Sequence, residues 1–175
     1  MHFETKQILN GSADEVEAAM LDERYLQFLL KNHGVLLQVE SKERRVEGNT
    51  VVRKVRYLPR PVIQSIGPKK VPPEWFAFIE NSTYDRTQKR LKFTNIPTNG
   101  SISKLLVNTG SITLKDLGGG KSERTVEGEI KLLLPFLLKP LGMIGERVIQ
   151  SEGLKILDGE VPVLNRFIAE TLRKE

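Results

Sequence analysis

The sequence predicts an α+β fold with one strand and two short helices, then about six antiparallel strands, and finally a long C-terminal helix. Three observations carry this prediction. A capping-box sequence follows the first strand, apolar residues repeat with a period of about two through the middle of the chain, and the period returns to about 3.6 after Pro140.

The early helices follow from capping and stop signals. Residues 2–9, HFETKQIL, alternate as a strand does. In the segment GSADEVEAAM, Ser12 and Glu15 have the spacing of a capping box, so we expect a helix to begin at Ser12. Asp22 then starts a second short helix, which Gly34 ends.

The strands follow from alternation. Val35, Leu37 and Val39 form one apolar face, and TVVRKVRYL and QKRLKFTN alternate in the same way. We expect EWFAFIENSTY to be a strand, without assigning it a face, and GSITLKDLGGGKSERTVEGEIKLLLP to be two strands around a glycine-rich turn. The proline-rich segment Leu58–Glu74 is expected to be a long loop, either the rim of a functional site or an ordinary surface excursion.

The last predicted element is an amphipathic helix. Its apolar stripe, with spacings of three or four residues, consists of Leu157, Val161, Leu164, Ile168 and Leu172. Pro162 removes an internal hydrogen bond and four glycines weaken the same span, so we expect a kinked or two-piece helix.

The composition limits the function. A chain of 175 residues predicts one domain, 1–175. With no cysteine and two histidines, we expect no disulfide, no metal site and no cofactor. The charges behind the net +5 are scattered, which argues against nucleic acid as a partner, and the start lacks a secretory pattern, so we expect a cytoplasmic protein. The apolar run Leu132–Leu138 is too short to span a bilayer, which takes about 20 residues.

Catalytic motifs are weak. The GGGKS segment lacks the first glycine of a phosphate-binding loop and lies between two predicted strands. His33 precedes the glycine that ends a helix, where a cationic side chain favours the helix C-terminus, so neither it nor His2 is expected to belong to a catalytic triad. We therefore assign no catalytic residue.

Arg53 is the most informative polar residue. In TVVRKVRY it shares strand parity with Val51, Val55 and Tyr57, so its side chain is predicted on the apolar side of the sheet. A buried guanidinium needs an acidic partner or a bound anion, whereas an arginine at the rim reaches solvent. The sequence leaves both alternatives open.

The order of elements resembles the START-like, helix-grip superfamily, which includes polyketide cyclases and birch-pollen-allergen-type lipid binders. The resemblance rests on NGSADEVEAAMLDERYLQFLL after the first strand, the hairpin GSITLKDLGGGKSERTVEGEIKL and the long last helix. It implies a curved antiparallel sheet of six to seven strands around the C-terminal helix, with an apolar cavity between them. The apolar segment KLLLPFLLKPLGMIGERVI would then lead out of the sheet into that helix.

The resemblance implies a non-enzymatic binder or carrier of a hydrophobic small molecule such as a lipid, a fatty acid or a polyketide-like compound. The alternatives are a cyclase- or hydrolase-like enzyme that uses Tyr57, Tyr84 or His33 for proton transfer, and a protein-interaction module with a filled core. A transient contact with a membrane surface is a further hypothesis, and the oligomeric state stays open. The expected ligand-binding residues are Arg53, Tyr57, Trp75, Phe93, Ile112, Val126, Ile130, Leu141 and Ile144.

Overall fold

The early part of the chain forms a strand and two helices. We describe a computed structural model, which covers residues 1–61, 65–66, 68–134 and 139–174. β1 (His2–Leu9) leads into α1 (Ala13–Leu21) and α2 (Glu23–Asn32). The Ser12 hydroxyl accepts from the Glu15 amide and the Glu15 carboxylate accepts from the Ser12 amide, which confirms the predicted capping box.

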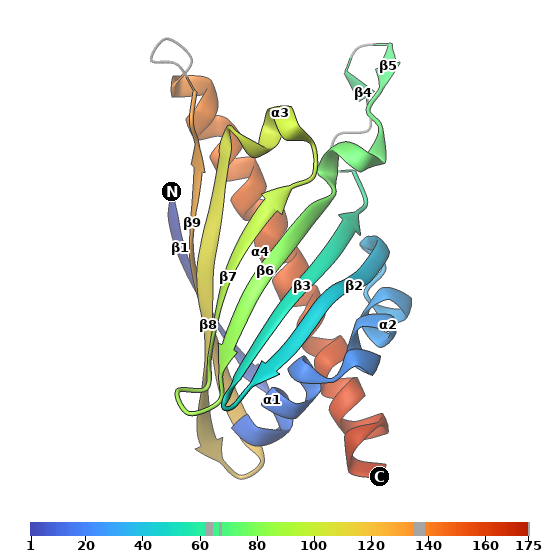
Figure 1. Ribbon diagram of the computed structural model, residues 1–175, viewed down its shortest axis with the longest axis vertical. Helices are drawn as coiled ribbons and strands as arrows, with labels where there is room; N and C mark the ends of the chain where they lie inside the picture. Colours follow the sequence, from blue (N-terminus) through green and yellow to red (C-terminus); the bar gives the residue numbers. More distant parts are fainter. Residues whose placement is uncertain (62–64, 67, 135–138, 175) are drawn as a thin grey trace.

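A seven-stranded antiparallel sheet forms the body of the molecule (Figure 1). The strand order is β1-β9-β8-β7-β6-β3-β2, so the first strand lies at one edge and pairs with the last strand. Six of these strands follow the early helices, as predicted. Their bounds are β2 (Leu36–Glu47), β3 (Thr50–Pro59), β6 (Phe78–Asp85), β7 (Arg90–Pro97), β8 (Leu106–Gly118) and β9 (Lys121–Leu132).

The β8–β9 hairpin has the turn that its sequence predicts. Gly118, Gly119 and Gly120 all have positive φ, between 60° and 78°, where a side chain would be strained. The turn therefore depends on three successive glycines, and GGGKS belongs to a hairpin and not to a phosphate-binding loop.

β8 and β9 each carry a glycine at a point of close approach between their backbones and two aromatic rings. Gly110 and Gly128 are register partners, and the ring of Phe93 lies against Gly110 while the ring of Phe3 lies against Gly128. A Cβ on Gly110 would lie 2.2 Å from the Glu127 carbonyl oxygen and 2.6 Å from Phe93 Cζ. The two backbones and the rings approach so closely only because both residues lack a side chain.

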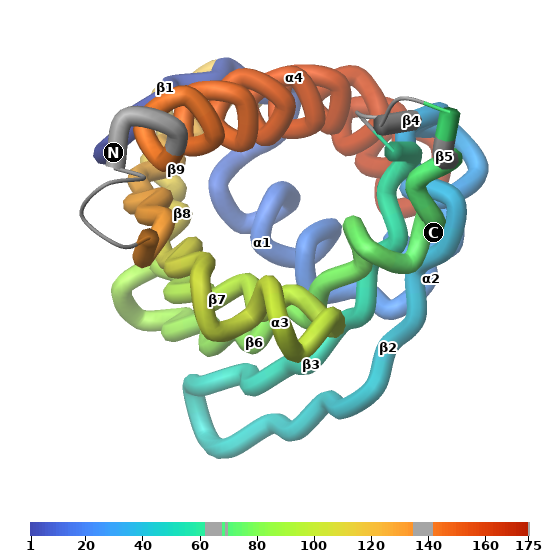
Figure 2. Tube along the Cα trace, turned by 90° about the horizontal axis from the view of Figure 1, so that it is seen from above, coloured from blue at the N-terminus to red at the C-terminus, as the bar shows by residue number. Residues whose placement is uncertain are grey.

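α4 (Lys139–Glu170) crosses the concave side of the sheet, and η3 (Leu172–Lys174) follows it (Figure 2). Of the two expected forms, kinked or two-piece, the two-piece helix is wrong, because α4 is continuous and Pro162 lies inside it and is exposed. Two of its glycines make close packing contacts, because a Cβ would lie 2.7 Å from Leu132 at Gly145 and 3.0 Å from His33 at Gly159. These contacts compensate for the low helix propensity of glycine.

Two strand predictions are corrected. A bulge between Leu36 and Gln38 shifts the register of β2, so Leu36 and Val39 are buried whereas Val35 and Leu37 are exposed. The start of EWFAFIENSTY is not a strand, because Pro73–Phe76 form the 3-10 helix η1.

The proline-rich segment also has structure of its own. It contains the short hairpin β4 (Ser65–Ile66) and β5 (Lys69–Lys70). The structure further adds a short helix that the sequence did not predict, α3 (Gly100–Ser103), between β7 and β8.

The closely packed core lies between the sheet, α1, α2 and the C-terminal half of α4. Tyr25 and Phe28 of α2 meet the ring of Phe167 edge-on, each with ring centroids 5.3 Å apart. From α4 the core takes Val163, Leu164, Phe167 and Ile168, all at most 5% exposed. This end of the molecule is therefore filled with side chains.

Candidate functional site

The inner face of the sheet has a buried half and a partly exposed half. At the end beside α1, the inner residues Val51, Tyr84 and Leu91 are at most 2% exposed. Further along the same strands several inner side chains are only half-buried, although Ser82 is 4% exposed and Val55 is fully buried. We call this region the open half; its half-buried members are Arg53, Tyr57, Phe78, Glu80, Phe93 and Asn95.

The helix opposite the open half is also only half-buried. Ile149, Gly153, Ile156 and Leu157 precede the core residues of α4 and are half-buried. Gly153 lies four and seven residues before Leu157 and Glu160, on the stripe that faces the sheet. A Cβ on Gly153 would meet no atom within 4 Å. The structure therefore leaves space at the inner stripe of α4 instead of a packed interface.

Three ionisable groups lie together in the open half. Burial raises the pKa of Glu80, and the nearby Arg53 charge offsets part of this rise. Burial also raises the pKa of Tyr57 well above its usual value, with a further increase from Glu80. Tyr57 stacks on Phe78, with ring centroids 5.3 Å apart. Side chains that are desolvated yet partly exposed are those expected at the wall of a recess.

Arg53 is half-buried, so it matches neither of the alternatives that the sequence left open, a buried guanidinium with an acidic partner or an arginine at the rim in solvent. Its Nη1 donates to the Met20 carbonyl oxygen at 2.5 Å, at the end of α1. Among the residues that the structure describes, it makes no ion pair. Arg53 is thus oriented inward and held by the backbone, with the rest of its guanidinium near Glu80 and Tyr57.

A buried polar cluster anchors the middle of α4. Arg124 of β9 is fully buried, and its guanidinium donates to Gln7 at 2.6 and 2.9 Å and to Glu160 at 2.8 Å. Tyr25 donates to the other Glu160 oxygen at 3.0 Å, and Gln7 donates to Asp158 at 2.9 Å. These contacts fix α4 against β1, β9 and α2, so we read the cluster as structural.

The two side chains named for alternative catalytic roles do not lie in the open half. His33 is the C-cap of α2, and its Nε2 lies 2.8 Å from the Ile156 carbonyl oxygen. Tyr84 is buried in the core and donates to Glu17 at 3.1 Å. Only Tyr57 of the three proton-transfer candidates lines the open half.

The structure brings together six of the nine predicted ligand-binding residues and separates the others. Trp75 lies on η1 and is 47% exposed, and Ile144 lies in the first part of α4 and is 60% exposed. Leu141 lies in the same helix, but its side chain is outside the described part of the structure. The six residues on the inner face are Arg53, Tyr57, Phe93, Ile112, Val126 and Ile130.

Sequence reasoning missed Glu80, Ser82 and Asn95. All three lie on the inner face: Glu80 is the register partner of Asn95, and Ser82 is the partner of Arg53. The signal that would have found them was the alternation of Phe78, Glu80, Ser82 and Tyr84 in β6, to which no face was assigned.

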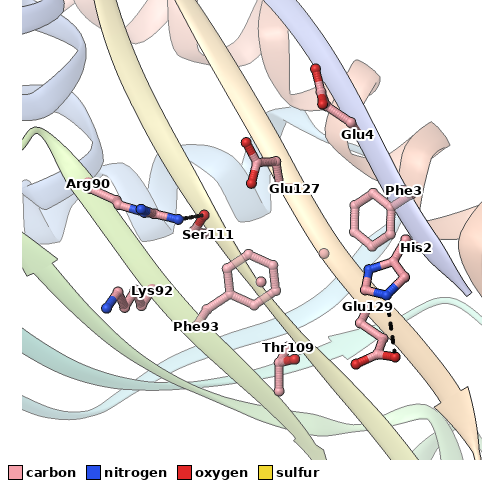
Figure 3. Close-up of a pocket in the computed structure, with 12 residues that line it drawn as sticks. His2, Phe3, Glu4, Arg90, Lys92, Phe93, Thr109, Ser111, Glu127 and Glu129 are labelled. Carbon is pink, nitrogen blue, oxygen red and sulfur yellow. Dashed lines mark hydrogen bonds and ion pairs between the residues drawn. The ribbon is translucent and has the colours of Figure 1, made fainter.

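A second depression lies on the outer face of the sheet (Figure 3). It has a volume of about 750 Å³ and spans β7, β8, β9 and β1 around Gly110 and Gly128. Its polar lining carries both signs of charge, with Arg90 and Lys92 on one side and glutamates on the other. It is broad and open, and it lies on the face of the sheet opposite to the open half.

Among the described residues, no group of three His, Asp or Glu side chains is placed to hold a metal ion. No helix in the described part of the chain is long and apolar enough to cross a bilayer.

Similarity to known proteins is visible in structure and not in sequence. No protein-family model and no curated protein matches the sequence. An aromatase/cyclase from Streptomyces sp. R1128 superimposes with a TM-score of 0.66 and 11% identity over 96% of this chain and 95% of its own.

Two other solved structures have the same architecture. Norcoclaurine synthase from Thalictrum flavum, in complex with dopamine and hydroxybenzaldehyde, gives a TM-score of 0.61 and 14% identity over 98% of this chain and 87% of its own. A START superfamily protein from Mycobacterium smegmatis gives a TM-score of 0.54 and 14% identity over 93% of this chain and 98% of its own. The chain therefore has the same helix-grip fold as these proteins.

Proposed function

We propose that the chain binds a hydrophobic small molecule between the open half of the inner face and the N-terminal half of α4. One observation carries the proposal: beyond the core, the inner faces of β3, β6 and β7 carry several half-buried side chains, opposite a helix glycine at which an added Cβ would meet no atom within 4 Å. Apolar side chains that face water inside a fold favour an apolar ligand, which removes their surface from water.

The comparison supports this proposal at the level of fold. The norcoclaurine synthase that shares this architecture holds two small aromatic molecules. Fold alone does not choose a function, so the proposal depends on the residues of this chain. The polar groups that would orient the ligand are Arg53 and Tyr57, as expected from the sequence, together with Glu80.

The test is to fill the space next to Gly153. We expect the apolar dye 8-anilinonaphthalene-1-sulfonate to bind the wild-type protein with enhanced fluorescence, and Gly153→Trp to weaken that binding at least tenfold. Gly153→Ala controls for helix propensity, and Ser151→Trp places the same ring on an exposed position of the same helix. Equal binding by the wild type and Gly153→Trp would show that the dye does not occupy this recess.

A catalytic role is the second candidate, and one observation favours it. Glu80, whose pKa is raised by burial, lies near Tyr57 in the part of the inner face that water reaches. A carboxyl group with a raised pKa is suited to general acid–base catalysis near neutral pH. The test is turnover of whatever ligand the purified protein releases on extraction. A rate whose pH dependence disappears in Glu80→Gln would identify an enzyme, and an unchanged ligand would leave a binder.

A further inference from the structure

Four polar side chains form a patch at the centre of the open half. Glu80 and Asn95 are register partners on β6 and β7, and Ser82 of β6 is the partner of Arg53 on β3. All four lie on the inner face because they share strand parity with Val51, Tyr84 or Leu91. The stacked rings of Tyr57 and Phe78 lie on the side of the patch away from the core, and the buried core lies on its opposite side.

The patch contains hydrogen-bonding atoms with no partner. Ser82 is 4% exposed, and its Oγ makes no hydrogen bond of normal geometry within the described residues, although it lies close enough to Glu80 to lower the pKa of that carboxyl. Asn95 Oδ1 is also buried and has no donor there. An unsatisfied buried polar atom costs about 1–3 kcal/mol unless water or a ligand completes its hydrogen bonds. The described residues contain five such atoms, and two of them lie on adjacent strands of the open half, where we expect a ligand to complete their hydrogen bonds.

The chemistry of the missing partner follows from what each atom needs. Asn95 Oδ1 and the Glu80 carboxylate both accept, so they need a donor. The Ser82 hydroxyl and the unused N–H groups of Arg53 can donate. A ligand hydroxyl meets both needs, since it donates one hydrogen bond and accepts others. A ligand carboxylate would lie beside Glu80, and it would leave Asn95 Oδ1 without a donor.

We propose that the patch formed by Arg53, Glu80, Ser82 and Asn95 recognises a hydroxyl group on an otherwise apolar ligand, and discriminates against a carboxylate. The inference rests on the proposed binding function and specifies the ligand class for the same recess. Asn95 Oδ1 accepts from the hydroxyl and Ser82 donates to it, while the ligand's apolar part covers Phe93 and the stripe of α4 around Gly153.

The test compares three ligands of equal chain length in displacement of 8-anilinonaphthalene-1-sulfonate: n-octanol, octyl methyl ether and octanoate. The ether keeps the acceptor oxygen and lacks the donor. In the wild type we expect n-octanol to compete at about a tenfold lower concentration than the ether, and more strongly than octanoate. In Asn95→Leu, which has similar shape and no unsatisfied acceptor, the preference for the alcohol should fall to within about twofold while the ether still competes.

Matched variants test the hydroxyl proposal separately from the proposed binding function. Asn81→Leu changes the neighbouring outer-face amide of β6 and should keep the preference for n-octanol. Equal competition by alcohol and ether in the wild type, tighter competition by octanoate, or a preference that survives Asn95→Leu would overturn the hydroxyl proposal and leave the recess standing. If none of the three competes and Gly153→Trp leaves dye binding unchanged, the proposed function itself fails, and this inference fails with it.

Discussion

At the scale of single residues, the interior contains two polar groupings with different roles. The cluster of Arg124, Glu160, Gln7 and Tyr25 is satisfied and holds α4 in place. The patch of Arg53, Glu80, Ser82 and Asn95 lies in the open half and contains two atoms with no partner of normal geometry among the described residues. A satisfied network stabilises a fold, whereas an unsatisfied one costs stability unless a ligand completes it.

Loss of Arg124 should be severely destabilising. We expect Arg124→Ala to lower the free energy of unfolding by about 3–5 kcal/mol, because Glu160 would remain buried without its partner. Urea denaturation measures the change. Lys155→Ala is the control: Lys155 pairs with Glu152 on the exposed surface of α4 at 2.6 Å, and its loss should change stability by less than about 0.5 kcal/mol. Similar effects of the two substitutions would contradict the anchoring role.

Glu80 should destabilise the empty protein in a pH-dependent way. Burial raises its pKa in the folded state, so the folded protein holds that proton more tightly than the unfolded chain does. The stability linked to this proton is full below the unfolded value of 4.5 and is lost as pH rises through the folded pKa. We therefore predict that Glu80→Gln is more stable than the wild type near pH 8 and equal to it near pH 4.

The exposed Glu4 is the control for that pH comparison, since Glu4→Gln should not change stability differently at the two pH values. Urea denaturation at both pH values gives the answer. A Glu80→Gln variant that is less stable near pH 8 would mean that the carboxylate is satisfied within the protein.

The sequence predicted the position of a side chain correctly where strand alternation assigned that side chain to one face of the sheet. Arg53 and Tyr57 were placed on the inner face from alternation alone, and they lie there. Glu80 and Asn95 were missed because polar residues on an inner face look like solvent-facing ones until the register with neighbouring strands is known. The surroundings of Glu160 also depend on a long-range contact, with Arg124, that no local pattern contains.

At the scale of elements, the close approach of β8, β9 and the Phe3 and Phe93 rings depends on the paired glycines of the two strands. We predict that Gly110→Ala destabilises the protein by about 3 kcal/mol, because the added Cβ would overlap the Glu127 carbonyl oxygen and the Phe93 ring. Gly100→Ala is the control, since a Cβ there meets no atom within 4 Å and its φ is not positive. Equal unfolding midpoints in urea for the two variants would show that the close approach is easily relaxed.

Element prediction was strongest where local signals were strong. The capping box, the glycine turn and the long last helix were all confirmed. The face of residues 35–39 was wrong because a bulge changes parity without leaving a mark in the alternation. Of the expected kinked or two-piece helix, the two-piece form was wrong, since α4 is held on both sides of Pro162 by the Arg124 cluster and by the core.

At the scale of the whole molecule, exposed apolar side chains gather at the end where α4 begins. Gly142 and Gly145 pack on the end of β9, next to Leu133, whose amide donates to the Leu105 carbonyl at 2.7 Å. Basic residues accompany this apolar set at Lys104, Lys131 and Arg147. We call this surface the rim patch; its exposed apolar members are Leu105, Leu133, Met143, Ile144 and Val148.

We propose that the rim patch contacts an anionic lipid surface when ligand is loaded. The protein should sediment with phosphatidylglycerol vesicles and less with phosphatidylcholine vesicles, and Ile144→Asp should weaken this binding several-fold. Val46→Asp, a matched change at an exposed apolar residue on β2, should leave it unchanged. Failure to sediment with either lipid would contradict this contact and would leave the recess unaffected.

Whole-molecule architecture was predictable from the order of elements, but the recess was not. Apolar residues that fill a core and those that line a cavity have the same sequence pattern, so the half-open inner face required the register of all seven strands and the position of α4. The expectation of one domain, 1–175, stays a prediction, which a single cooperative unfolding transition would support.

The central claim is that a hydrophobic ligand occupies the space between the open half of the sheet and α4. The most direct measurement is a titration of the isotope-labelled protein with n-octanol, followed by amide and side-chain NMR. The account predicts saturable shifts at Tyr57, Glu80, Phe93, Asn95 and Gly153, with the core around Leu164 unaffected. Shifts confined to the rim patch or to the outer depression, or no saturable shifts at all, would contradict it.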